Sequence, residues 1–153
     1  MAMLEPLLAA HPFFTDLEPR FLQVVAGCVA NRRFPAGAFL GREGEAANQF
    51  YLLRHGKVAL QISVPERGPV TIETMEAGEV CGWSCLFPPY RWHFDVQALE
   101  LTRVLVFDGQ CLRAKCEADH DLGYALMQRF AQVVVQRLQA TRLQLLDLYG
   151  VHA

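Results

Sequence analysis

The sequence predicts an α+β domain in which short N-terminal helices precede a β jelly roll (a double-stranded β-helix) and a long C-terminal helix follows it. Three observations predict this order. Apolar residues recur at helical spacing in residues 4–30, short alternating runs separated by glycines fill residues 31–107, and residues 121–149 contain no proline and one early glycine. We expect one domain over residues 1–153, with helices at 4–30, the jelly roll at 31–107 and C-terminal helices at 108–149.

Two short helices are predicted at the N-terminus. Thr15, Asp16 and Pro19 mark the start of the second helix, because capping oxygens and a first-turn proline are common at helix starts. The apolar residues of the two stripes are Leu4, Leu7 and Leu8, followed by Phe21, Leu22, Val25 and Val29.

The middle of the chain is predicted to form β-strands. Val58, Leu60 and Ile62 alternate with less apolar neighbours, residues 65–69 form a turn, and residues 70–75 alternate again on the way back. A β-hairpin is the natural interpretation, and residues 101–107 supply a last strand. The glycines that punctuate these runs are Gly37, Gly41, Gly44, Gly56, Gly68, Gly78 and Gly82.

The C-terminal helix is predicted over residues 121–149, about 43 Å long at 1.5 Å per residue. One apolar seam runs along it at spacings of four and three, with Thr141 as its single polar member. A small barrel cannot cover the whole helix, because Phe130, Val133, Val135, Leu143 and Leu146 also need a partner. We expect that second face to pack on the barrel and the seam to form a two-fold homodimer contact; a helix folded back on its own domain is the alternative. The seam residues are Met127, Ala131, Val134, Leu138, Thr141, Leu145 and Leu148.

Composition narrows the function classes. The 153 residues carry a formal net charge of −2, which does not indicate a basic nucleic-acid surface. No apolar run is long enough to span a membrane and no signal peptide is apparent, so a cytoplasmic protein is expected. Its five cysteines, an odd number, are then expected to be reduced thiols. The Cys81/Cys85 and Cys116/His120 spacings lack the two-residue gap of convincing metal sites, so no metal is predicted.

Motifs of catalysis are incomplete. Residues 82–86 begin like a nucleophile elbow, but Leu86 stands where the second glycine belongs. Gly56-Lys57 is followed by Val58 rather than the serine or threonine of a phosphate-binding loop. We therefore expect a protein that is not an enzyme.

Six local segments follow one another along the chain: Pro12-Phe13-Phe14, Arg33-Phe34-Pro35-Ala36-Gly37, Gly41-Arg42-Glu43-Gly44-Glu45, residues 50–58, residues 77–82 and Arg137-Leu138-Gln139-Ala140-Thr141. In this order they resemble the cyclic-nucleotide-binding domain of the catabolite activator protein (Crp/Fnr) superfamily. The resemblance covers nearly the whole chain, and the order and spacing of the segments make it specific.

The resemblance implies a site for a cyclic nucleotide or another planar small ligand, with no cofactor that is certain. In that family a loop, here residues 78–96, holds the cyclic phosphate through backbone N–H groups and an arginine, while a glutamate binds the ribose. Gly82 matches the family glycine and Thr141 the helix threonine, but Trp83 occupies the glutamate position and Trp92 the arginine position. Ordinary cyclic AMP binding is not expected. The candidate ligand-binding residues are Gly82, Trp83, Ser84, Cys85, Arg91, Trp92, His93 and Thr141.

Three interpretations of this loop stay open. Arg91 or His93 turns inward and an anion is held with the indoles stacking on a planar base, or a more apolar aromatic ligand binds. In the third, Trp83 and Trp92 plug the pocket as part of a packed aromatic lid, and the protein is a ligand-free interaction scaffold.

The resemblance also bears on partners. Catabolite activator relatives continue into a DNA-reading helix-turn-helix, whereas only residues 150–153 follow the long helix here. We therefore expect no specific DNA binding by this chain alone, no membrane contact, and a protein partner for output. Met1 and Gly150 favour a stand-alone protein over a fragment of a longer chain.

Overall fold

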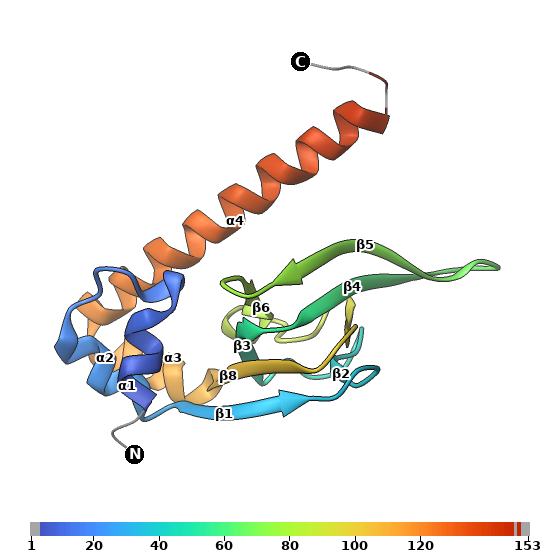
Figure 1. Cartoon of the computed structure of the whole chain (residues 1–153). Helices are drawn as coiled ribbons and strands as arrows, with labels where there is room; N and C mark the ends of the chain where they lie inside the picture. The colour runs from blue at the N-terminus through green and yellow to red at the C-terminus, as the bar shows by residue number, and fades with distance from the viewer. Residues whose placement is uncertain (1–3, 149, 151–153) are drawn as a thin grey trace.

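A computed structural model describes residues 4–148 and residue 150. It confirms the α+β order of N-terminal helices, jelly roll and long C-terminal helix (Figure 1). The elements are α1 (Leu4–Ala10), the 3₁₀ turn η1 (Pro12–Phe14), α2 (Pro19–Ala26), β1 (Val29–Phe34), β2 (Phe39–Gly41), β3 (Gln49–His55), β4 (Lys57–Val64), β5 (Gly68–Glu76), β6 (Val80–Cys81), η2 (Trp83–Leu86), β7 (Asp95–Ala98), β8 (Thr102–Asp108), α3 (Gly109–Ala118) and α4 (His120–Leu148).

Two antiparallel sheets of four strands form the jelly roll, in the orders β1-β8-β3-β6 and β2-β7-β4-β5. The predicted hairpin is confirmed as β4 and β5, which pair from Lys57 opposite Glu76 to Val64 opposite Gly68. The predicted helical stripe was wrong at its end, because Val29 begins β1 opposite Phe107. Backbone pairing with β8 overrides the helical spacing of that residue.

The first part of α4 packs on the rest of the molecule. Leu122, Leu126 and Phe130 are buried at a spacing of four, and the Phe130 ring lies 4.9 Å from the Phe13 ring and 5.2 Å from the Phe50 ring between centroids. These contacts join α4 to η1 and β3. We call residues 120–133 the base of α4.

Beyond residue 137 the helix leaves the barrel, and Figure 1 shows its end extending away from the strands. The predicted barrel face was wrong for Val135, Leu143 and Leu146, which are exposed. Leu143 and Leu146 lie beyond the reach of the strands, whereas Val135 precedes Arg137 and stands on a side of α4 that faces away from the barrel. Every member of the seam is also exposed, and the dimer stays a prediction; these are Met127, Ala131, Val134, Leu138, Thr141, Leu145 and Leu148.

The prediction of five reduced thiols was wrong for one pair. Cys28, between α2 and β1, forms a disulfide with Cys111 in the first turn of α3, with Cα atoms 5.7 Å apart. The count of cysteines could not show that β1 and α3 bring these two residues together from 83 positions apart. Cys81, Cys85 and Cys116 are free.

Two features of the described residues bear on function. No group of three or more histidine, cysteine or acidic side chains within residues 4–148 gathers as a metal site. None of the helices described is both long and apolar enough to cross a membrane.

A candidate ligand site beside the long helix

The candidate loop, residues 78–96, connects the end of β5 to β7 and contains β6 and η2. Gly82 precedes η2 with a left-handed φ of 95°. Trp83 and Ser84 follow and are half-buried, whereas Cys85 is buried. Burial raises the pKa of the Cys85 thiol to about 12, so this sulfur is a neutral packing group rather than a nucleophile.

Trp92 is inserted into the protein and is 7% exposed. A Cβ atom at Gly41 would lie 2.2 Å from its Cε2 atom, and one at Gly82 would lie 2.6 Å from its Cη2 atom. The Tyr51 ring lies parallel to it with centroids 6.3 Å apart. Only glycine at these two positions leaves space for the indole, so Trp92 is a packed core residue that closes this side of the barrel.

Arg91 and His93 flank the buried indole and are both exposed. The Arg91 guanidinium donates from Nη1 to the Gly44 carbonyl at 2.8 Å, and the Trp92 backbone pairs with Gly44 and Glu45. Backbone pairing thus holds residues 91–93 in alternating directions, with the aromatic side chain inward and the two basic ones outward. The role of Arg91 or His93 in ligand binding stays a prediction.

Trp83 has a different neighbour, because the Arg137 guanidinium of α4 lies over its ring at 5.2 Å from the centroid. Arg137 forms an ion pair from Nη1 to Glu73 Oε2 at 2.9 Å and donates from Nη2 to the Val80 carbonyl at 3.0 Å. Its side chain is only 14% exposed. The Nε atom is buried and lacks a hydrogen-bond partner among the described residues.

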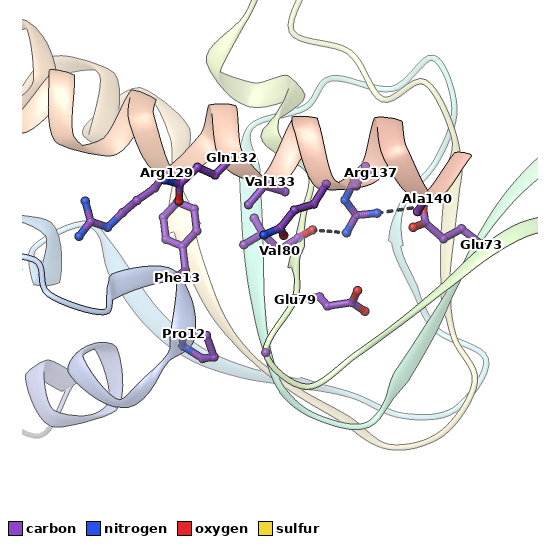
Figure 2. Close-up of a pocket in the computed structure, with 12 residues that line it drawn as sticks. Pro12, Phe13, Glu73, Glu79, Val80, Arg129, Gln132, Val133, Arg137 and Ala140 are labelled. Atoms are coloured by element: carbon purple, nitrogen blue, oxygen red, sulfur yellow. Dashed lines mark hydrogen bonds and ion pairs between the residues drawn. The ribbon is translucent and has the colours of Figure 1, made fainter. Parts of the chain in front are cut away.

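A cavity of about 280 Å³ lies at this contact, between α4, the β5–β6 connection and η1 (Figure 2). Figure 2 shows Arg137 projecting from α4 toward Val80 and Glu73, whereas Arg129 extends away from them and donates to the Thr15 carbonyl. Its wall carries both charges and amides, so it suits a polar or anionic ligand better than an apolar one. The lining residues are Pro12, Phe13, Glu73, Gly78, Glu79, Val80, Arg129, Gln132, Val133, Gln136, Arg137 and Ala140.

Thr141 lies one turn beyond Arg137 on α4 and is exposed. Its hydroxyl donates to the Arg137 carbonyl at 2.9 Å. It does not line the cavity at Arg137, and none of residues 82–93 does. The candidate residues are therefore distributed around the space between the loop and α4 and do not converge on one point within this single chain.

Sequence reasoning missed Arg137, Glu73 and Glu79 as site residues. Arg137 stood inside the segment that carried the family resemblance, four positions before Thr141 and so on a neighbouring part of the same helix face. Its place inside that segment was the available signal.

A second hollow, of about 520 Å³, lies on the other side of Trp92. Arg32, Arg42, Glu45 and Tyr51 contribute to its wall. Burial raises the pKa of Tyr51 to about 12, and its hydroxyl donates to the Leu40 carbonyl at 2.9 Å. The phenol is thus a neutral structural donor that fixes β2 beside the indole.

Comparison with known families decides the identity of this fold. The model of the cyclic nucleotide-binding domain matches residues 31–119, more than half of the chain. The chain belongs to this family. The match begins in β1 and ends at the turn between α3 and α4, so it contains the whole jelly roll and the candidate loop.

Three relatives illustrate the likeness. A putative cyclic nucleotide-binding protein from Geobacter metallireducens is 29% identical, with a TM-score of 0.79 over 88% of this chain and 97% of that one. The sensor domain of the transcriptional regulator DNR from Pseudomonas aeruginosa is 22% identical, with a TM-score of 0.71 over 90% and 93%. Cyclic nucleotide-gated ion channel 18 from Arabidopsis thaliana is 24% identical over 95% of this chain, which spans about a fifth of the channel's length.

This cyclic nucleotide-binding domain is therefore a regulatory ligand-binding fold with an unusual loop. The two indoles occupy the positions at which the family resemblance implies a glutamate and an arginine. One of them is buried against glycines and the other lies under an arginine of α4. Two arginines contact the loop from helices: Arg113 of α3 donates to the Cys85 carbonyl and lies over the Tyr90 ring, and Arg137 of α4 lies over the Trp83 ring.

Proposed function

We propose that this protein is a non-enzymatic sensor that binds a small, planar, anionic ligand between the candidate loop and α4 and signals through the pose of that helix. The ligand class is a cyclic nucleotide or another planar anion held by Arg137 and stacked on Trp83. We also assign donor roles to the loop N–H groups near Gly82 and Ser84 and a capping role to Thr141, none of which lines the cavity at Arg137 in the single chain.

One observation carries the proposal, the incomplete pairing of Arg137. A buried donor without a partner costs about 1–3 kcal/mol, and this guanidinium holds one in its Nε–H. Guanidinium groups bind oxyanions through two parallel hydrogen bonds. An anion at Arg137 would accept from the unpartnered Nε–H and would compete with the Glu73 carboxylate for the Nη1 group.

Competition at Arg137 also explains how binding reaches the helix. The Arg137–Glu73 ion pair and the bond to Val80 are the outermost contacts between α4 and the barrel among the hydrogen bonds of the described residues. A ligand that takes over these contacts stabilises one pose of α4 over another. The exposed seam, as a homodimer contact, would pass that change to a second copy and to a protein partner.

Trp92 favours a second candidate function, that of a scaffold without a ligand. Its indole closes the space over Gly41 and Gly82, as expected for a plug that replaced a ligand. In that case the Arg137–Glu73 ion pair holds α4 against β5 permanently.

Thermal-shift screening separates the two functions. Cyclic AMP, cyclic GMP, cyclic dinucleotides and haem are the probes, and a sensor should gain about 2.7 kcal/mol of stability at a hundred times the dissociation constant. Arg137→Gln should weaken the binding of an active probe about ten- to a hundredfold, because it removes a charge-assisted bond.

The matched control is Arg142→Gln, since Arg142 is an exposed arginine on the same helix. It should leave probe binding unchanged. If no probe shifts the melting temperature, the scaffold is favoured. If both variants lose the same amount of probe affinity, Arg137 is not part of the binding site.

A further inference from the structure

A cluster of arginines lies on the sheet β1-β8-β3, apart from the cavity at α4. Arg32 and Arg33 come from β1, Arg103 from β8 and Arg54 from β3. Together with Asn31 they line a shallow hollow of about 280 Å³. We call these four residues the arginine cluster.

Strand register places these like charges beside one another. Arg33 lies directly opposite Arg103, and on the other side of Arg103 stands His55. Arg54 reaches across β8, because its Nη1 atom donates to Asn31 Oδ1 at 3.4 Å. Directly opposed like charges destabilise a strand pair, so the arrangement opposes folding rather than supporting it.

No carboxylate neutralises the cluster within residues 4–148. The ion pairs of the described residues use other arginines, namely Arg20, Arg42 and Arg137, and one lysine. Arg33 and Arg103 are exposed, and their side chains form no hydrogen bond or ion pair with the residues that the structure describes. Their guanidinium groups are thus available to an external oxyanion.

We propose that the arginine cluster binds a short acidic segment of a partner protein, in extended conformation, along β1. β1 is the edge strand of its sheet and pairs only with β8, and Figure 1 shows its other side without a neighbouring strand. An edge strand offers backbone N–H and C=O groups to an extended peptide. Strands in a sheet lie about 4.8 Å apart, so Arg33 stands on β1 itself and Arg103 one strand inward from it, and both face acidic side chains of a peptide that runs along β1.

A short peptide fits better than an extended polyanion. The chain carries a formal net charge of −2, so the surface outside the cluster repels a nucleic acid or an anionic membrane that reaches past it. A single small anion on an exposed site is strongly screened by water and salt. The free edge of β1 adds contacts that only a peptide backbone uses.

The test measures the binding of a fluorescein-labelled octaglutamate peptide by fluorescence anisotropy, at low ionic strength and across a salt series. The double variant Arg33→Gln/Arg103→Gln should bind the peptide on the order of tenfold more weakly. The matched control, Arg67→Gln/Arg142→Gln, removes two exposed arginines elsewhere and should bind like the parent. Circular dichroism of both variants should match the parent, because all four substituted arginines are exposed.

Two further probes separate the sources of negative charge. A single-stranded oligonucleotide and inorganic pyrophosphate should compete with the peptide only weakly. Stronger binding of the oligonucleotide or of pyrophosphate, lost in the cluster variant, would overturn the peptide in favour of that anion. Equal losses in the cluster and control variants, or no saturable peptide binding by the parent, would overturn the site. The cluster variant keeps Arg137, so its thermal shift with nucleotide probes reports separately on the proposed function.

Discussion

The two ends of α4 have a similar apolar content and opposite surroundings. At the base, Leu122, Leu126 and Phe130 are at most 3% exposed. In the last eleven residues, 138–148, Leu143 is 61% exposed and Leu148 80%. The helix therefore continues for about 16 Å beyond Arg137, whose ion pair with Glu73 joins α4 to β5.

This difference shows which part of α4 belongs to the fold and which part needs another molecule. A large apolar stripe that finds no partner within its own chain marks an interaction site. Arg137 lies at the boundary between the two parts, where the proposed ligand also acts. Changes at the base should therefore alter stability, and changes in the distal part should alter association.

Phe130→Ala is expected to have the largest effect on stability. It removes a buried ring that contacts Phe13 and Phe50, and truncation of a buried phenylalanine costs about 3–5 kcal/mol. Urea unfolding followed by circular dichroism measures the change. Val135→Ala, at an exposed position of the same helix, should fall within about 0.5 kcal/mol of the parent. A similar loss in both variants would abolish the distinction between base and distal part.

The fold was largely predictable because its signals are local. The alternation of residues 57–63, the turn at 65–69 and the helical run from residue 121 each reflect one element, and β4, β5 and α4 follow them closely. The extent of the barrel is not local. Whether Leu146 is covered depends on how far the strands reach along α4, and the spacing of leucines contains no such length.

Reduction of the Cys28–Cys111 disulfide should have the next largest effect. The bond closes a loop of 83 residues and ties the end of α2 to the start of α3, the helix that precedes the base of α4. Its loss should lower the free energy of unfolding by about 2–4 kcal/mol. The double variant Cys28→Ser/Cys111→Ser should reproduce the effect of a reductant in a thermal melt.

Cys116→Ser is the control, since Cys116 is a free, half-buried thiol of α3. It should change stability little and should remain sensitive to reductant. If the melting temperature of the parent does not respond to reductant, and all five thiols titrate beforehand instead of three, Cys28 and Cys111 are reduced, as the cysteine count predicted.

The site was less predictable than the fold, for a reason that Arg137 and Glu73 illustrate. They stand 64 positions apart, and their ion pair exists because α4 crosses β5 with a particular rotation. The two tryptophans could be named from the sequence. That Trp92 is buried and Trp83 only half-buried depends on Gly41 and Gly82, which leave space for the Trp92 indole because they have no Cβ atom. Tertiary geometry of this kind has no counterpart in residue spacing.

Leu138→Lys tests the distal part. If the exposed seam forms a homodimer, a charge at the centre of that contact should weaken association by about ten- to a hundredfold and yield monomers in light scattering. The unfolding free energy of the monomer should stay nearly constant, because Leu138 is 48% exposed in the single chain. Gln139→Lys adds the same charge one position away from the seam and should leave the dimer intact. Dimers that persist in Leu138→Lys would show that the seam is not the contact.

The smallest expected effect is a pH dependence of the free energy of unfolding that arises at His11. His11 is buried, its Nδ1 accepts from the Phe13 N–H at 3.2 Å, and its Nε2 contacts the Leu53 carbonyl at 3.1 Å. Burial, opposed by the hydrogen bond to Leu53 and reinforced by the nearby Arg54 charge, lowers the pKa of His11 below its ordinary value of 6.5. The neutral ring, with its proton on Nε2, satisfies both partners.

Below pH 6.5 the unfolded chain binds a proton at His11 before the folded protein does. The contribution of neutral His11 to the free energy of unfolding should therefore be fully present above pH 6.5. It should decrease as the pH falls from 6.5 toward the lowered pKa of the folded state. His11→Gln removes this titration while keeping a polar side chain, so the curve of stability against pH should be flatter in the variant over that interval. Because His11 lies two positions before Phe13, which packs on Phe130, the loss should appear in unfolding and not in dimer dissociation. Parallel curves for parent and variant would mean that this ring does not couple protons to the base of α4.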